Sequence, residues 1–171
     1  MEDKILQDKI DKAIEKIRKS TEECSIYIGC DSKVFRNRKD KTKKRFSKYR
    51  IHVWVHRNSC NGAYCIFKHN ITEEFYGKTR NIQQRLLKEV ELASNIAVAL
   101  QPHVGNRRFE IHLDINSDEH NRSNEIANMA MGYVQGMTGI KPMLKPNSPA
   151  ASFAADRAVN NKMKWSKVEG I

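Results

Sequence analysis

Four acidic residues of this 171-residue chain fall where a carboxylate is costly unless it meets a cation or a hydrogen-bond donor. Asp31 and Asp114 each end a short apolar run that is typical of a buried strand. Glu89 lies at the edge of the apolar stripe of a long predicted helix, and Asp156 lies in the middle of an Ala-rich one. Because the four come from different elements, we predict that Asp31, Glu89, Asp114 and Asp156 converge on one acidic site.

Such a site suits divalent metal ions. Cleavage of a phosphodiester bond by two metals needs hard oxygen ligands that hold the ions about 4 Å apart. Asp31 is the predicted bridging ligand, with Glu89 and Asp114 completing one side and Asp156 the other. All four are therefore candidate catalytic and metal-ligating residues, and Mg²⁺ or Mn²⁺ is the expected cofactor.

A dense run of cations follows Asp31. Residues 33–50 hold ten Lys or Arg and one acidic residue, so this segment cannot build a core. Two interpretations are open: a solvated hairpin loop, or an arm that contacts phosphates, with aromatic residues available to stack on bases. We favour the arm because Asp31 lies at its base. Its candidate nucleic-acid-binding residues are Lys33, Arg36, Arg38, Lys39, Lys41, Lys43, Lys44, Arg45 and Lys48.

The overall charge agrees with a nucleic-acid partner. The formal net charge is +11, and its clustering indicates a polyanion, with DNA, RNA or their hybrid ahead of an anionic membrane surface. No apolar run of 18 residues is present, so we expect no membrane span. The charged start of the chain has no apolar segment of a secretory signal, so we expect a cytoplasmic protein with reduced cysteines. Cys60, Cys65 and His69 are a weaker possibility as zinc ligands, because their spacing matches no strong zinc pattern.

Apolar periodicity predicts the elements that must position the acidic residues. An amphipathic helix is expected over 4–19, within an N-terminal segment 1–23. A single domain is expected over 24–163, and a tail over 164–171. Within the domain the predicted order is strands at 25–32, 49–57 and 63–68, a helix at 79–100, a strand at 109–116, a helix at 123–135, a strand at 140–144 and a helix at 150–163.

Two further expectations concern single segments of this domain. Residues 69–78 are polar and are expected to be irregular. The buried side of the 123–135 helix is expected to hold Ile126, Met129, Ala130, Tyr133 and Val134. Because no heptad or large exposed apolar patch can be read from the sequence, the oligomeric state is open.

This βββαβαβα order, taken with four short motifs, resembles the ribonuclease H-like superfamily and, more narrowly, the YkuK-type bacterial family within it. The motifs are Gly29-Cys30-Asp31-Ser32, Lys88-Glu89-Val90, His112-Leu113-Asp114-Ile115-Asn116 and Ala154-Ala155-Asp156-Arg157. The resemblance covers roughly residues 24–163. It implies an α/β fold with a mixed five-stranded sheet flanked by helices and an acidic metal cluster at the strand ends.

By the same resemblance, Asp31, Glu89, Asp114 and Asp156 inherit metal-ligand roles, with Glu91 as the alternative to Glu89. On a 3.6-residue helix, Glu91 is rotated about 200° from Glu89 and is expected to face solvent. The superfamily includes hybrid nucleases, junction resolvases, exonucleases and transposases, so its fold does not choose the substrate.

Three functions are therefore distinguished. The first is a divalent-metal-dependent nuclease that uses a two-metal, ribonuclease H-like mechanism. The second is a nucleic-acid-binding protein with the same fold and a degenerate or unused catalytic site. The third is a structural or regulatory protein in which Asp31, Glu89 and Asp156 are paired with arginines. Digestion with and without a chelator separates the first from the second.

Overall fold

Alternating apolar residues between positions 25 and 75 fold into an antiparallel meander of three strands, β1 (Ser25–Arg36), β2 (Arg45–His56) and β3 (Ala63–Phe75). The computed structural model of the chain describes residues 2–36, 45–57, 62–75, 82–116, 124–148 and 150. Ile26 pairs with Val55, and Ile28 pairs with Val53. All four of these side chains are buried, so the register of β1 and β2 is fixed by one apolar face.

The sheet is completed by β4 (Arg108–Asn116) and β5 (Met143–Lys145), in the order β3-β2-β1-β4-β5. β4 runs parallel to β1, and β5 runs parallel to β4. Each parallel step needs a crossover, which α2 (Ile82–Leu100) and α3 (Asn124–Thr138) supply. This arrangement confirms the predicted α/β fold with a mixed five-stranded sheet.

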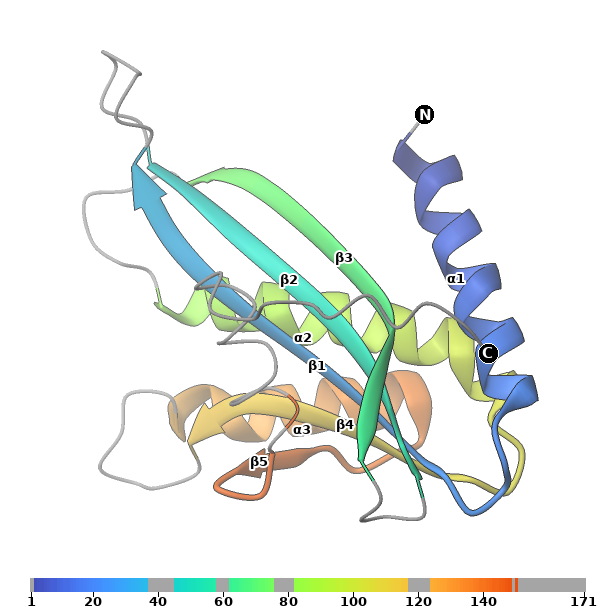
Figure 1. Cartoon of the computed structure of the whole chain (residues 1–171). Coiled ribbons are helices and arrows are strands. Elements are labelled where there is room, and N and C mark those ends of the chain that lie inside the picture. The colour runs from blue at the N-terminus through green and yellow to red at the C-terminus, as the bar shows by residue number, and fades with distance from the viewer. Residues whose placement is uncertain are drawn as a thin grey trace.

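The helices pack on the apolar side of the sheet. α2 and α3 lie behind it in Figure 1, and α1 (Glu2–Lys19) lies beside β3 and one end of α2. A short 3-10 helix, η2 (Gln101–His103), follows α2. The core lies between this face of the sheet and the helices, and α2 contributes Leu86, Val90, Leu92, Ala93, Ile96, Ala97 and Leu100. None of the helices in the described ranges is long and apolar enough to cross a membrane.

Three strands are longer than predicted. β3 continues to Phe75, so the expectation that residues 69–78 are irregular is wrong as far as residue 75. The reason is that Ile71 is still opposite Tyr49 and still packs on the core. β1 and β2 likewise extend to Arg36 and back to Arg45, so both ends of the basic 33–50 segment form a paired ladder instead of a loop.

The α3 helix differs from the prediction in its exposed side. Met129 and Tyr133 were expected to be buried, but they are 60% and 41% exposed. Its buried side is instead built from Ile126, Ala127, Ala130 and Val134. Because two of these are alanines, we infer that α3 approaches α2 closely and leaves larger side chains at the margin.

Several predictions fall outside the described residues. They are the turn at 58–61, the 117–122 loop, most of the 150–163 helix and the 164–171 tail. Ala150 is described, and it is buried against β4, where its backbone N–H donates to His112 Nδ1 at 3.0 Å.

Candidate active site

The parallel register of β1 and β4 brings Asp31 and Asp114 to the same level of the sheet. Gly29 pairs with His112 at the end of the paired stretch. Each aspartate follows two residues later, so both side chains lie on the same face. That face is opposite the helices, because the residues on either side of Asp114, Leu113 and Ile115, are buried in the core. The carboxyl ends of neighbouring parallel strands are a common position for ligand binding in α/β sheets.

Glu89 joins this site from α2. It lies among the core residues of the helix and is only 4% exposed, as predicted from its place beside the apolar stripe. The Ser32 hydroxyl donates to Glu89 Oε1 at 2.5 Å, and the Ser32 amide donates to Asp31 Oδ1 at 2.7 Å. Arg85 donates to the Ser32 carbonyl at 3.3 Å. Ser32 therefore links the helix carboxyl to the strand carboxyl.

Burial and neighbouring charge keep Glu89 protonated at neutral pH. Its pKa is raised from 4.5 to about 8, chiefly by loss of hydration on burial and then by the charges of Asp31 and Asp114. The hydrogen bond from Ser32 and the charge of Arg85 act in the opposite direction. Because both aspartates act on Glu89, the three carboxyl groups share one electrostatic environment.

A lysine pairs with the third carboxylate. Lys145 Nζ, at the end of β5, lies 2.5 Å from Asp114 Oδ1. The Lys145 side chain is 40% exposed and that of Asp114 is 24% exposed, so solvent screens the pair and its contribution to stability is small. In the protein without metal, this lysine supplies part of the positive charge that a cation would bring.

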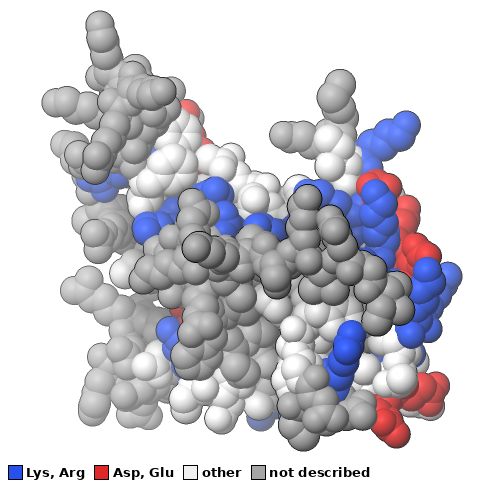
Figure 2. Space-filling view, viewed as in Figure 1, with Lys and Arg blue, Asp and Glu red and all other residues white. Residues whose placement is uncertain are grey.

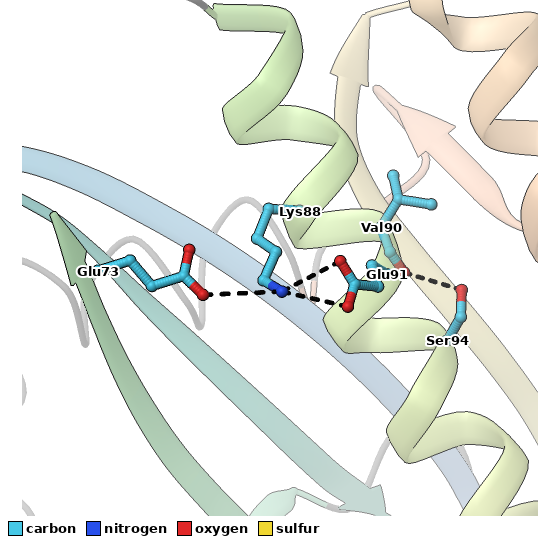
Figure 3. Close-up of polar contacts among 5 residues, drawn as sticks. All are labelled: Glu73, Lys88, Val90, Glu91 and Ser94. Atoms are coloured by element: carbon cyan, nitrogen blue, oxygen red, sulfur yellow. Dashed lines mark hydrogen bonds and ion pairs between the residues drawn. The ribbon is translucent and has the colours of Figure 1, made fainter. Parts of the chain in front are cut away.

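Glu91, the alternative to Glu89, lies elsewhere. Its carboxylate accepts from Lys88 Nζ at 3.1 Å, and Lys88 also lies 3.6 Å from Glu73 of β3 (Figure 3). The Glu91 side chain is 44% exposed. Of the two α2 carboxylates, Glu89 is therefore the one that contacts the segment carrying Asp31.

His112 lies on β4 two residues before Asp114, on the same face of the sheet. Its ring stacks on Tyr27 with the ring centroids 5.0 Å apart. Because Nδ1 accepts from the Ala150 amide, Nε2 carries the proton and donates to Glu110 Oε2 at 3.0 Å. Burial lowers the pKa of His112, which favours this neutral form. His112 thus fixes the chain at residue 150, just before the segment that contains Asp156.

Of the four predicted acidic residues, Asp31 and Glu89 are linked through Ser32, and Asp31 and Asp114 both act electrostatically on Glu89, while Asp156 lies outside the described residues. Within the described ranges, no group of three or more His, Cys, Asp or Glu side chains is already placed to hold a metal ion. The donor set nevertheless fits a hard divalent cation, because it consists of carboxyl oxygens, and burial followed by the charges of Asp31 and Asp114 disfavours a charged Glu89 unless a cation is present.

Zinc is a poor fit to Cys65, the described cysteine of the predicted alternative. Its thiol donates to the Phe67 carbonyl at 3.0 Å, and burial raises its pKa to about 11. A zinc ligand must be a thiolate, so this environment opposes the role. Its suggested partner Cys60 lies outside the described residues.

Four of the predicted nucleic-acid contacts are described, and all four lie on the β1–β2 hairpin, with Lys33 opposite Lys48 and Arg36 opposite Arg45 in the backbone register. Lys33 and Lys48 lie on the same face as Asp31, because they follow the same alternation. Figure 2 shows Lys and Arg side chains gathered over the middle of β1 to β3 on the face seen in Figure 1. The remaining predicted contacts, Arg38, Lys39, Lys41, Lys43 and Lys44, lie outside the described residues.

Sequence reasoning did not assign roles to Ser32, Arg85, Lys145 and His112. Ser32 had one usable signal, its position directly after Asp31 within a predicted strand. Lys145 had none, because only the pairing of β5 beside β4 brings it to Asp114.

Comparison with protein families gives one match. The family described as ribonuclease H-like matches residues 6–160. Comparison with curated proteins and with solved structures found no match.

The raised pKa of Glu89 predicts a pH dependence of stability in the absence of divalent cations. The folded protein holds a proton that the unfolded chain releases above 4.5, so the free energy of unfolding should fall as pH rises from 4.5 to about 8. The slope should be about 1 kcal/mol per pH unit. Urea unfolding in EDTA should show this fall in the wild type and a flatter profile in Glu89→Gln. Glu91→Gln is the matched control on the same helix and should keep the wild-type slope. If the free energy of unfolding fell equally with pH in all three proteins, the raised pKa would not belong to Glu89.

Proposed function

The chain belongs to the ribonuclease H-like family, and on that premise we propose that it is a divalent-metal-dependent nuclease that hydrolyses phosphodiester bonds of nucleic acid. The observation that carries the proposal is the burial of Glu89 against Ser32, which also donates to Asp31, with Asp31 and Asp114 both acting electrostatically on Glu89. A carboxyl that burial and then neighbouring carboxylates keep protonated stabilises a fold poorly, and it is a good candidate ligand for a cation.

Asp31, Glu89 and Asp114 are the residues that would hold Mg²⁺ or Mn²⁺, and Asp156 is the fourth candidate. When bound, the metal would supply a Lewis acid for the phosphoryl oxygen and an activated water. The protein supplies the positioning. Ser32 fixes the orientation of Glu89 through its hydroxyl and that of Asp31 through its amide.

The β1–β2 hairpin supports binding of the substrate. Lys33 and Lys48 lie directly opposite each other in the ladder, so their side chains concentrate positive charge on one face, and like charges in this position repel. A phosphate backbone would relieve this repulsion and release counterions. Because Lys33 lies two residues from Asp31 on the same face, a strand bound along the hairpin would pass the acidic site.

One observation favours a second function, a nucleic-acid-binding protein that does not cleave. Lys145 already lies 2.5 Å from Asp114, so a cation of the protein partly neutralises the site. In this alternative, the acidic residues are balanced within the chain and only the hairpin is used.

The nuclease proposal predicts that Asp31→Asn lowers the cleavage rate at least about 100-fold while the protein still folds and binds nucleic acid. A panel of single-stranded, duplex, hybrid and branched substrates with Mg²⁺ or Mn²⁺ measures the rate, and EDTA should abolish it. Asp8→Asn, which removes an exposed carboxylate on α1, is the control and should cleave like the wild type. Full activity of Asp31→Asn would refute the mechanism, and binding without cleavage of any substrate would favour the second function.

The hairpin assignment predicts a weaker salt dependence of binding when Lys33 and Lys48 are both changed to Gln. The slope of log K against log salt concentration for duplex DNA should become less steep by up to about 1.8, since each lost phosphate contact contributes about 0.9. The control changes Lys12 and Lys19 of α1, two exposed lysines in i,i+4 ion pairs, to Gln. Equal changes in both double variants would mean that net charge, and not the hairpin, sets the affinity.

A further inference from the structure

The outer side of α3 carries a line of exposed apolar side chains. Met129, Tyr133 and Met137 are 60%, 41% and 46% exposed. They recur every four residues, so they lie along one side of the helix. Gly132 and Gly136 fall on the same side, and nothing lies within 4 Å of where a Cβ would stand at either position. A contiguous exposed apolar surface of this kind usually marks an interaction site.

A groove runs beside this line, between α2 and α3. It has a volume of about 450 Å³, and Leu87, Val90, Met129 and Tyr133 form its apolar walls. Lys88 and Glu91 lie at its rim, and their charges compensate each other at 3.1 Å (Figure 3). The surface therefore combines projecting side chains with a hollow beside them.

Charge decides what this surface can bind. Residues 126–140 contain no Lys, Arg, Asp or Glu in a chain of which 30% is charged. The helix thus offers no cation to a phosphate backbone, and nucleic acid is a poor partner for it. Two copies of this chain carry a formal net charge of +11 each and repel one another. In a two-fold contact the residues near the axis face their own copies, so charged residues there would repel, and the outer side of α3 avoids this because residues 126–140 carry no charge.

We propose that a second copy of this chain docks on the outer side of α3, with the two α3 helices packed against each other around a two-fold axis. Such an interface must be complementary to itself, so each copy must offer both projections and hollows. Met129 and Tyr133 are the projections, the groove beside them is the hollow, and the two glycines let the helices approach. Asp31 and Asp114 lie on the other face of the sheet, so this dimer leaves both acidic sites open. The proposal does not depend on the proposed activity.

Sedimentation equilibrium of the full chain tests this proposal over a concentration range of about three decades. The wild type should associate to a dimer, and Met129→Lys should raise the dissociation constant at least about 10-fold. Tyr133→Glu should have the same effect.

The matched control is Gln135→Lys, which adds the same charge to an exposed position of α3 rotated about 120° from Met129. It should dimerise like the wild type. Because all three positions are exposed, thermal unfolding should show that the variants keep their fold. A wild type that stays monomeric throughout the series would overturn the proposal, including the case in which this surface binds another protein. Equal weakening by Met129→Lys and Gln135→Lys would also overturn it.

Discussion

The hydrogen bond between Ser32 and Glu89 is the interaction on which the acidic site depends. It ties α2 to β1 at the point where β1 carries Asp31. A carboxyl group in the core costs several kcal/mol when it is charged, and an apolar side chain of similar volume usually stabilises a fold better. Here the cost is reduced because Glu89 keeps its proton, with a pKa of about 8. This placement weakens the core at one position and gives the sheet a third carboxyl beside Asp31 and Asp114.

The two faces of the sheet carry different kinds of residue. One face holds the apolar residues that pack against α2 and α3, and Glu89 of α2 lies buried in this layer, where it accepts a hydrogen bond from Ser32 of β1. The other face carries the two aspartates and the lysines of the β1–β2 hairpin. The helical layer separates the uncharged outer side of α3 from the two aspartates and from the lysines of the hairpin. Contacts with nucleic acid and with a second copy can therefore be made on different sides of the domain.

Local patterns predicted most of the framework, and tertiary packing decided the rest. The apolar patterns at 25–32, 49–57 and 63–68 predicted the three strands of the meander, and the apolar stripe of 79–100 predicted α2 and the burial of Glu89. The extension of β3 was missed because its polar residues hide the alternation that Ile71 continues. Met129 and Tyr133 were placed on the wrong side of α3, because an apolar residue at the margin of a helix stripe looks the same in sequence whether a partner covers it or not. Lys145 reaches Asp114 only through strand order, which no local pattern encodes. Asp156 stays a prediction.

The central claim is that Asp31, Glu89 and Asp114 together bind a divalent cation. The most direct test is anomalous diffraction at the manganese edge from crystals of the full chain grown with Mn²⁺. The account predicts an anomalous peak within ligand distance of the Asp31 and Asp114 carboxylates and beside Glu89, with Lys145 displaced from Asp114. A fully occupied Lys145–Asp114 pair, with no peak near Asp31 at saturating Mn²⁺, would contradict it.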